Sequence, residues 1–479
     1  NMQNIKVFFI PIETKVRDYE SRLLISLKIL SLGKAKQIKI FFGERRKLLN
    51  LLDFEYKKEI KHFVYLALGV DQQVLFYHNL IKKNGIFTSL DEESAIFSSN
   101  IKKAYNRHIF NKACLNYIYK IFVWGKFDND SILNNNKLSK EHLKISGNPR
   151  FDLSKKKFDF FYEKKFKQKT LNKKIFINCA FGLINNYVDQ KVDTKVWSIK
   201  VKNYPSYKNL WKSLEEYEST LFPKFIEGIT YLIKSLPNEN FVIRPHPIEN
   251  EKIYINLFKD FPNVIIDKQS SIQSEFLNSK LIIHNGCTTA VEGTFHDLNV
   301  ICFNPFFQSE NVQTLTYEVS NLIQDKIILL NYVKKILIHE MPPDNLNEIK
   351  SKYIKPIIDN IDYCSFNIIA EELFKINQSS TLEFYKNRIS QVKIFEKINI
   401  LEIKIRYKIL KLFSDLIIKF FYKKYLNQIN NREKSKSNLE INEISNDVNI
   451  LKNYLNIQDK IYINEIKDGC FELSLDKIS

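Results

Sequence analysis

The chain has 479 residues, of which 44% are hydrophobic, so it is too long for one ordinary core and suggests two domains with additions. Its formal net charge is +19, but Lys, Ile, Asn and Phe are all plentiful while Gly is scarce, as in proteins from AT-rich genomes. We therefore attribute the charge to a solvated basic surface and predict no nucleic-acid partner, since no nucleic-acid-binding module is recognisable. Attraction to anionic lipid or to an acidic substrate is the alternative.

The cysteines and the apolar segments bear on metals and on the cellular compartment. The six cysteines are scattered without a C-x-x-C pair, and no histidine cluster has zinc-ligand spacing. We therefore expect no metal and no cofactor, and thiols that stay reduced in a cytoplasm. No run of about 18 apolar residues occurs, so no membrane span is predicted. The predicted location is the cytoplasm, with peripheral contact to the inner face of an anionic membrane as an open alternative.

Short apolar runs alternate with helical patterns along most of the chain. In the first 150 residues the predicted strands cover 5–10, 37–42, 62–66, 85–87, 121–124 and 143–146. A second set comprises strands at 174–178, 241–244, 263–267, 281–283 and 299–303, with a helix at 221–236. Strands that alternate with helices at this spacing predict parallel, doubly wound sheets. The expected fold class is α/β, with two Rossmann-like domains that face each other across a cleft.

The domain boundaries follow from these two sets. We expect an N-terminal Rossmann-like domain over 1–153, a lysine-rich linker helix over 154–173 and a C-terminal Rossmann-like domain over 174–345. Residues 346–426 are predicted to be helical, and their basic, amphipathic part at 394–426 either lies on a membrane surface or packs back on the two domains. Residues 427–479 are interpreted as a polar linker and a small appended element.

Two motifs follow predicted strands of the second domain and indicate a phosphate site. One is Arg244-Pro245-His246-Pro247, and the other runs from His284 to Gly293. Ligands of open α/β sheets bind at the carboxyl ends of strands. The turn at Gly286 is expected to let two threonines cap a helix whose backbone N–H groups face an anion. The predicted nucleotide and phosphate site consists of Arg244, His246, His284, Asn285, Gly286, Thr288, Thr289 and Glu292.

Two of these residues have alternative interpretations. His284 either contacts the nucleotide or bonds the backbone of its own loop. Glu292 lies one helical turn after Thr288 and either reaches ribose hydroxyls or belongs to the helix surface.

The first domain carries acidic and basic groups at its own predicted strand ends. Asp91 and Glu92 follow a strand, and neighbouring carboxyl groups can acquire the split pKa values that acid/base catalysis needs. Alternatively, the acids simply begin a helix, where they suit its dipole. We predict that these two residues are catalytic. Candidates for binding an anionic acceptor are Glu13, Lys15 and Arg17 after the first strand, and Asn148 and Arg150 in the turn at 147–152.

Five motifs in this order resemble the bacterial surface carbohydrate (polysaccharide) biosynthesis proteins. They are PIETKVR at 11–17, SLDEE at 89–93, GNPRFD at 147–152, RPHP at 244–247 and HNGCTT at 284–289. That group is similar to GT-B glycosyltransferases, including those that use CMP-activated 3-deoxy-ulosonic acids such as Kdo. The resemblance implies that His246, Thr288 and Thr289 hold the nucleotide phosphate and that Asp91 and Glu92 supply catalysis. It covers about residues 5–310.

The expected function is therefore that of a glycosyltransferase in surface polysaccharide biosynthesis. It would transfer a sugar, such as a Kdo-like ulosonic acid, from a CMP-linked donor to a glycan or lipid-linked acceptor. Three alternatives remain open: a CDP-polyol phosphotransferase of the teichoic-acid type, a UDP-sugar 2-epimerase, and an inactive scaffold of a glycan assembly complex.

Overall fold

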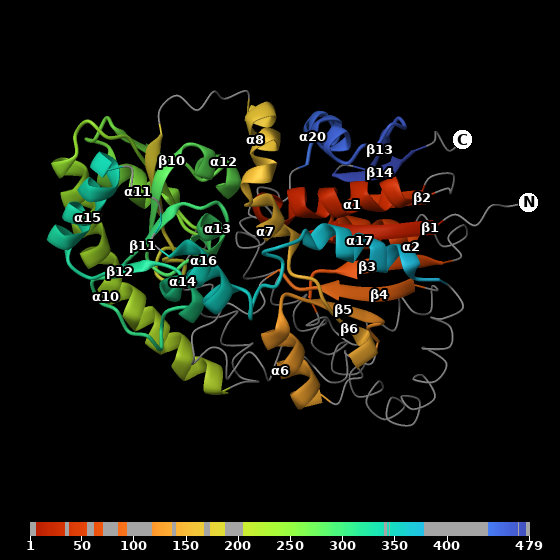
Figure 1. Ribbon diagram of the computed structural model, residues 1–479, viewed down its shortest axis with the longest axis horizontal. Helices are drawn as coiled ribbons and strands as arrows, with labels where there is room; N and C mark the ends of the chain where they lie inside the picture. The colour runs from red at the N-terminus through yellow and green to blue at the C-terminus, as the bar shows by residue number, and fades with distance from the viewer. Residues whose placement is uncertain are drawn as a thin grey trace, which may run out of the picture.

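The computed structural model consists of two α/β units joined through the segment that contains α7 and α8 (Figure 1). It describes residues 6–33, 38–54, 62–69, 85–92, 117–136, 140–166, 173–186, 205–339, 343, 345–377, 439–467 and 469–475. Each unit is built around one sheet, with β1–β6 in the N-terminal unit and β7–β12 in the C-terminal unit. The expected α/β fold class with two parallel-stranded sheets is thereby confirmed.

The sheet of the N-terminal unit has eight strands in the order β13-β14-β2-β1-β3-β4-β5-β6. Strands β1 to β6 pair in parallel, whereas the β13–β14 hairpin joins the edge of the sheet antiparallel to β2. The strands are β1 (Lys6–Ile12), β2 (Ile38–Glu44), β3 (Phe63–Ala67), β4 (Gly85–Leu90), β5 (Lys120–Val123), β6 (Leu143–Ile145), β13 (Tyr462–Lys467) and β14 (Cys470–Ser474).

The sheet of the C-terminal unit is parallel throughout, in the order β12-β11-β10-β7-β8-β9. This order matches that of a dinucleotide-binding doubly wound sheet, in which the first strand lies at the centre. The strands are β7 (Lys174–Asn178), β8 (Phe241–Arg244), β9 (Val264–Ile266), β10 (Ser279–His284), β11 (Asn299–Phe303) and β12 (Asn321–Ile323). The sequence reading missed β12, which is short and largely exposed.

Helices cover the sheets and connect the parallel strands. In the N-terminal unit and the segment after it they are η1 (Lys15–Tyr19), α1 (Glu20–Leu32), α2 (Arg45–Phe54), α6 (Lys126–Asn136), η2 (Lys140–His142), α7 (Pro149–Leu153), η3 (Lys156–Phe158) and α8 (Asp159–Phe166). In the C-terminal unit they are α10 (Pro205–Ser235), α11 (Glu251–Phe258), α12 (Ile272–Leu277), α13 (Thr289–Phe295), α14 (Thr314–Glu318) and α15 (Lys326–His339). Four further helices follow, namely α16 (Leu346–Ile349), η4 (Lys350–Ile354), α17 (Ser365–Lys375) and α20 (Ile441–Tyr454).

The parallel strands are apolar on both faces because helices cover both sides of each sheet. In β1, Phe8 and Ile10 belong to one core cluster, whereas Val7 and Phe9 belong to another. The first of these clusters continues from the N-terminal unit into one face of the C-terminal sheet. At the junction, the rings of Phe151 and Phe295 stack with their centroids 5.3 Å apart. The two units therefore share a hydrophobic core.

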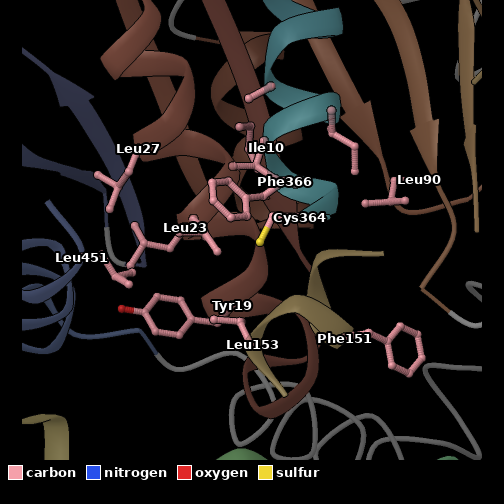
Figure 2. Packing of buried hydrophobic residues seen from close by; sticks show 14 of the residues in the cluster. Ile10, Tyr19, Leu23, Leu27, Leu90, Phe151, Leu153, Cys364, Phe366 and Leu451 are labelled. Carbon is pink, nitrogen blue, oxygen red and sulfur yellow. The ribbon is translucent and has the colours of Figure 1, made fainter. Parts of the chain in front are cut away.

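The C-terminal segment differs from the predicted polar linker and appended element. Residues 441–454, which span the end of the predicted linker and the start of the predicted appended element, form helix α20, which packs against α1 and α8. Strand β14 pairs with β2, so that Phe471 lies opposite Phe42. Figure 2 shows Leu451 of α20 beside Tyr19 and Leu23. The apolar residues of this helix recur at helical spacing, but the many polar residues between them obscure the pattern in the sequence.

The region after residue 345 is partly integrated into the N-terminal unit. Helix α17 packs against α1, and Figure 2 shows Phe366 and Cys364 next to the same core side chains. The basic stretch predicted at 394–426 and Glu93 of the motif at 89–93 lie outside the described residues. None of the helices in the described part of the chain combines the length and the hydrophobicity that crossing a membrane requires.

Candidate functional site

The strand orders define a topological switch point in each sheet. In the C-terminal unit the chain moves from β7 to β8 on one side and reaches β10 on the other. In the N-terminal unit β1 lies between β2 and β3. Ligands of doubly wound folds bind beyond the carboxyl ends of the strands at such points. The motif that begins at His284 follows β10, and the one that begins at Glu13 follows β1, so both lie at switch points.

Buried polar side chains join the loops after β7 and β10. The backbone N–H of Ala180 donates to Oδ1 of Asn285 at 2.9 Å, and Nδ2 of Asn285 donates to the carbonyl of Ala180 at 3.1 Å. Asn178 donates through Nδ2 to Sγ of Cys287 at 3.0 Å. Asn285 is buried, and its amide already bonds within the protein. The structure therefore gives this predicted ligand-binding residue a part in holding the loops together.

Glu249 braces the loop after β8 against the loop after β7. Its carboxylate is fully buried and accepts hydrogen bonds from the backbone N–H groups of Phe181 at 2.9 Å and His246 at 3.0 Å. Asn185 and Tyr254 donate to its second oxygen at 3.2 and 2.6 Å. Glu249 is not among the site residues predicted from the sequence, although it is an acidic residue only three positions after His246.

His284 serves the structure of its own loop. Its ring is fully buried, and burial lowers its pKa to about 3. Nδ1 accepts from the backbone N–H groups of Gly286 at 3.0 Å and Cys287 at 3.3 Å, while Nε2 lies 2.9 Å from the hydroxyl of Ser320. Gly286 has φ +120°, which favours glycine. Of the two interpretations of His284, the geometry favours the bond to the loop backbone.

The two threonines do not cap the following helix as the sequence suggested. Thr288 has helical φ and ψ of −58° and −20°, and its side chain makes no capping hydrogen bond. Thr289 is fully buried, with Oγ1 3.3 Å from Sγ of Cys287. The capping prediction was wrong because an N-cap needs extended backbone geometry, which Thr288 lacks. Thr288 is half-buried at the carboxyl end of β10.

Arg244, the last residue of β8, is a buried cation with an unmet hydrogen-bonding need. Its side chain is 2% exposed, and Nη1 has no hydrogen-bond acceptor in the described part of the protein. Burial lowers the pKa of the guanidinium, while Asp267, Glu275 and Glu292 raise it through their charges. An unsatisfied donor on a buried charged group is costly. The side chain is therefore suited to receive an anionic ligand.

His246 lies two residues after Arg244, in the loop that follows β8, and is half-buried. Its Nδ1 accepts from the backbone N–H of Ile248 at 3.3 Å. We therefore assign the proton of the neutral ring to Nε2. A Cβ added to Gly182, in the loop after β7, would lie 4.0 Å from Nδ1. The imidazole is thus placed where the loops after β7 and β8 approach each other.

Glu292 and Arg150 form an ion pair between the two units. Nε of Arg150 lies 3.0 Å from Oε1 of Glu292, and both side chains are buried. Burial raises the pKa of Glu292, and the charges of Arg150 and Arg244 lower it. The guanidinium of Arg150 also lies over the rings of Trp124 and Phe151 at 5.7 and 5.1 Å. Neither expected role, ribose contact for Glu292 or acceptor binding for Arg150, explains this pairing.

Glu92, predicted as catalytic, is held in a buried ion pair with Arg22 of α1. Oε1 of Glu92 accepts from Nε and Nη2 of Arg22 at 2.9 and 2.7 Å. Arg22 also donates to the carbonyls of Leu66 and Leu90 at 2.9 and 3.1 Å. Burial raises the pKa of Glu92, but Arg22 and its other partners lower it to a net value below normal. A carboxylate held in this way has little freedom to act as a base or nucleophile.

Asn148 connects the same carboxylate to the turn after β6. Its Nδ2 donates to Oε2 of Glu92 at 3.0 Å, and its Oδ1 accepts from the backbone N–H of Arg150 at 2.8 Å as the N-cap of α7. The side chain is fully buried. The structure therefore brings together Glu92, Asn148, Arg150 and Glu292. The sequence had assigned Glu92 to catalysis, Asn148 and Arg150 to acceptor binding, and Glu292 to nucleotide binding.

Asp91 is the more accessible of the two predicted catalytic acids. It is half-buried, and its carbonyl accepts from Nε1 of Trp124 at 2.7 Å and from Nδ2 of Asn148 at 3.3 Å. These bonds hold its backbone at the carboxyl end of β4. Its carboxylate is thereby the better candidate for contact with a substrate.

Asp18 is a buried carboxylate that the sequence reading did not select. It is fully buried and accepts from the backbone N–H groups of Glu13 at 2.7 Å and Thr14 at 3.0 Å. Burial raises its pKa to about 6, an effect that Arg17 opposes and Glu92 reinforces. Asp18 therefore fixes the conformation of the loop after β1. The one indication of this in the sequence is that Asp18 directly follows the motif at 11–17.

The acceptor candidates after β1 form ion pairs near the surface. Glu13 lies 3.3 Å from Nη2 of Arg17, and its side chain is 51% exposed. Lys15 pairs with Glu443 of α20 at 2.5 Å. The C-terminal helix thus touches the loop after β1, which nothing in the local sequence indicated. In the part of the chain that the structure describes, no group of three or more His, Cys, Asp or Glu residues could hold a metal ion.

The buried carboxyl group of Glu218 in α10 is expected to make the free energy of unfolding depend on pH. Its carboxylate accepts from the backbone N–H of Leu183, and burial raises its pKa from 4.5 to about 8. A carboxyl group with a raised folded-state pKa stabilises the fold while it is protonated, and this stability is lost as the pH rises through 8. From pH 7 to pH 9 the loss is expected to be about 1.4 kcal/mol. Urea unfolding of the wild type and of E218Q at both pH values tests this.

The variant keeps an oxygen acceptor for Leu183 but does not titrate. E218Q should therefore lose about 1.4 kcal/mol less than the wild type between the two pH values. The buried cysteines, whose pKa values are also raised, titrate alike in both proteins and cancel in the difference. Equal pH dependence of the two proteins would contradict the prediction.

Comparison with known proteins finds similarity in solved structures alone. No protein-family model matches the chain, and no curated protein matches it. Among solved structures, the wall teichoic acid polymerase TagF is 9% identical, with 80% of this chain and 90% of that chain covered and a TM-score of 0.48. The UDP-GlcNAc 2-epimerase from Methanocaldococcus jannaschii is 12% identical over 77% and 99%, with a TM-score of 0.46. The S. aureus MnaA–UDP structure is 12% identical over 81% and 98%, with a TM-score of 0.41.

Proposed function

We propose that this protein is a glycosyltransferase of surface polysaccharide biosynthesis that uses a nucleotide-linked donor. The donor phosphate binds Arg244, His246 and the chain around Thr288, at the carboxyl ends of β8 and β10. The observation that carries the proposal is the buried guanidinium of Arg244, whose Nη1 has no acceptor among the residues that the structure describes. A phosphate oxygen would supply that acceptor through a charge-assisted hydrogen bond, and Nε2–H of His246 would add a second donor.

The proposed donor nucleotide is CMP, and the proposed sugar is a Kdo-like ulosonic acid, both on the basis of the motif resemblance. The acceptor is a glycan or a lipid-linked glycan that meets the N-terminal unit near the loop after β1. In the reaction, the bond from the anomeric carbon to the donor phosphate breaks and a bond to an acceptor oxygen forms. The developing phosphate charge is stabilised by donors already in place at Arg244 and His246.

Asp91 is the proposed base or nucleophile, and Glu92 is proposed as a positioning residue. The carboxylate of Glu92 already accepts three hydrogen bonds, two from Arg22 and one from Asn148. Asp91 directly precedes it and is more exposed. In this arrangement Arg22 and Glu92 fix the carboxyl end of β4 so that Asp91 is presented to the substrate.

Three other functions are alternatives to this proposal, and they differ in the nucleotide that the protein would bind and in the product that it would form. A CDP-polyol phosphotransferase would respond to CDP and form a phosphodiester. A UDP-sugar 2-epimerase would respond to UDP and change the sugar without an acceptor. An inactive scaffold would bind none of these nucleotides.

Thermal shift and calorimetric titration with CMP, CDP, UDP and GDP test the proposal. The wild type should be stabilised, with CMP as the preferred nucleotide. H246A should bind at least tenfold more weakly, a loss of about 1.4 kcal/mol or more, because a phosphate donor is removed. D91N should bind the nucleotide as the wild type does but lose turnover, measured as glycoside formed from the sugar-linked donor.

The exposed His339 of α15 provides a matched control, since H339A removes an imidazole far from β8 in the sequence and should bind normally. Binding that survives H246A, or turnover that survives D91N, would count against the assignment. Stabilisation by UDP or CDP in place of CMP would favour the epimerase or the phosphotransferase. No response to any of the four nucleotides would favour the scaffold.

A further inference from the structure

Buried charges of alternating sign run from the N-terminal unit into the candidate phosphate site. Arg22 pairs with Glu92, and Arg150 donates through Nη1 to the carbonyl of Glu92 at 3.4 Å. Arg150 then pairs across the junction with Glu292 at 3.0 Å. Glu292 in turn interacts electrostatically with Arg244. All five side chains are at least nine-tenths buried, so their interactions are little screened by solvent.

Glu292 is therefore shared between two guanidinium groups from different units. It makes a close ion pair with Arg150, whereas Nη1 of Arg244 has no hydrogen bond to any of the described residues. The charge of Glu292 acts on Arg244 together with the charges of Asp267 and Glu275, and a carboxylate that attracts the guanidinium also repels an anion bound to it. How strongly Glu292 does so depends on how fully Arg150 neutralises it, because the net charge of a tight pair is close to zero.

We propose that Arg150 of the N-terminal unit sets the anion affinity of Arg244 in the C-terminal unit, acting through Glu292. With the ion pair in place, Glu292 is neutralised and Arg244 is free to bind a phosphate oxygen. Without Arg150, the unpaired carboxylate of Glu292 turns to Arg244 and competes with the phosphate. Phosphate binding and the contact between the two units thereby favour each other, as linkage requires.

This inference rests on the proposed function, since it takes the anion at Arg244 to be a donor phosphate. It makes Glu292 and Arg150 positioning residues, and it requires neither of them to touch the ligand. An alternative role for the pair, in folding alone, would change stability without changing anion affinity in a charge-dependent way. Control of anion affinity and a role in folding alone are distinguished by whether replacing Arg150 and replacing Glu292 change the anion affinity in opposite directions.

The experiment measures the dissociation constants of CDP and of inorganic pyrophosphate by calorimetry for the wild type, R150M, E292Q and the double variant. R150M should bind both probes about three- to tenfold more weakly, because Glu292 is left to compete for Arg244. E292Q should bind both about three- to tenfold more tightly, because the competing carboxylate is gone. In the E292Q background, adding R150M should change affinity less than twofold. R150K, which keeps the charge, should stay within about twofold of the wild type.

The double variant also keeps the test valid if R150M unfolds, because it removes both charges of the Arg150–Glu292 pair together. Circular dichroism of each variant at the titration temperature shows which ones are folded. Unchanged or weakened binding by folded E292Q, or an R150M effect that persists in the E292Q background, overturns the inference while leaving the proposed function intact. A wild type that binds neither these probes nor CMP, UDP and GDP overturns the proposed function, and this inference with it.

Discussion

Replacing Arg22 by methionine is expected to destabilise the fold by about 3–5 kcal/mol, measured by urea or thermal unfolding. The reason is that Glu92, which is 2% exposed, would be left as an unpaired buried carboxylate. The carbonyls of Leu66 and Leu90 would lose donors at the same time. The pKa of Glu92 should then rise, since Arg22 is the charge that lowers it most. The loss would fall on the ends of β3 and β4, next to Asp91.

Two further variants separate the buried pair from ion pairing in general. The R22M/E92M double variant should recover most of the lost stability, because apolar replacements often substitute for a buried ion pair. K326M removes an exposed ion pair with Glu227, in which the two side chains are 40% and 64% exposed, and should cost far less stability than R22M. If R22M cost no more than K326M, the Arg22–Glu92 pair would not anchor this part of the N-terminal unit.

Deleting residues 439–479 is expected to prevent stable folding of the protein. The deletion removes helix α20 and the β13–β14 hairpin, and it exposes the edge of β2. Each fully buried apolar side chain of the segment contributes about 1.5–3 kcal/mol. Together these side chains are comparable with the whole stability of a domain, about 5–15 kcal/mol. Solubility and cooperative unfolding of the shortened chain provide the measurement.

Single substitutions measure how much the C-terminal segment contributes to the stability of the fold without removing the segment. Phe471 of β14 is fully buried, and F471A should cost about 3–5 kcal/mol because it leaves a cavity. Ile441, at the start of α20, is 36% exposed, so I441A should cost less than about 1 kcal/mol. A shortened chain that unfolds cooperatively and still responds to nucleotide would show that the segment is a dispensable appendage after all.

The C-terminal segment illustrates where local sequence patterns stop being informative. Helix α20 has buried Ile444, Val448 and Leu451 on one face, but its other residues are so polar that the sequence predicts a linker over the first half of the helix. Strand β14 joins the sheet at β2, more than 400 residues earlier in the chain. The nearby sequence predicts neither the strand with which an edge strand pairs nor the surface on which a C-terminal helix packs.

The sequence by itself located most of the parallel strands and the places where their loops begin. Parallel strands that are covered on both faces are continuous apolar runs. The runs in the sequence therefore locate β7, β8, β10 and β11, each to within a few residues. The turn at Gly286 was equally local, because a φ of +120° favours glycine.

Only the tertiary structure decided which of the polar residues at those strand ends are engaged within the protein. Glu92 meets Arg22 across 70 positions, and Glu292 meets Arg150 across the junction of the two units. His284 and Asn285 turn inward to bond the loop backbone, while Arg244 is left without an acceptor at Nη1. The physical reason is that burial follows from local apolar patterns, whereas the partner of a buried charge depends on which strands become neighbours in the sheet.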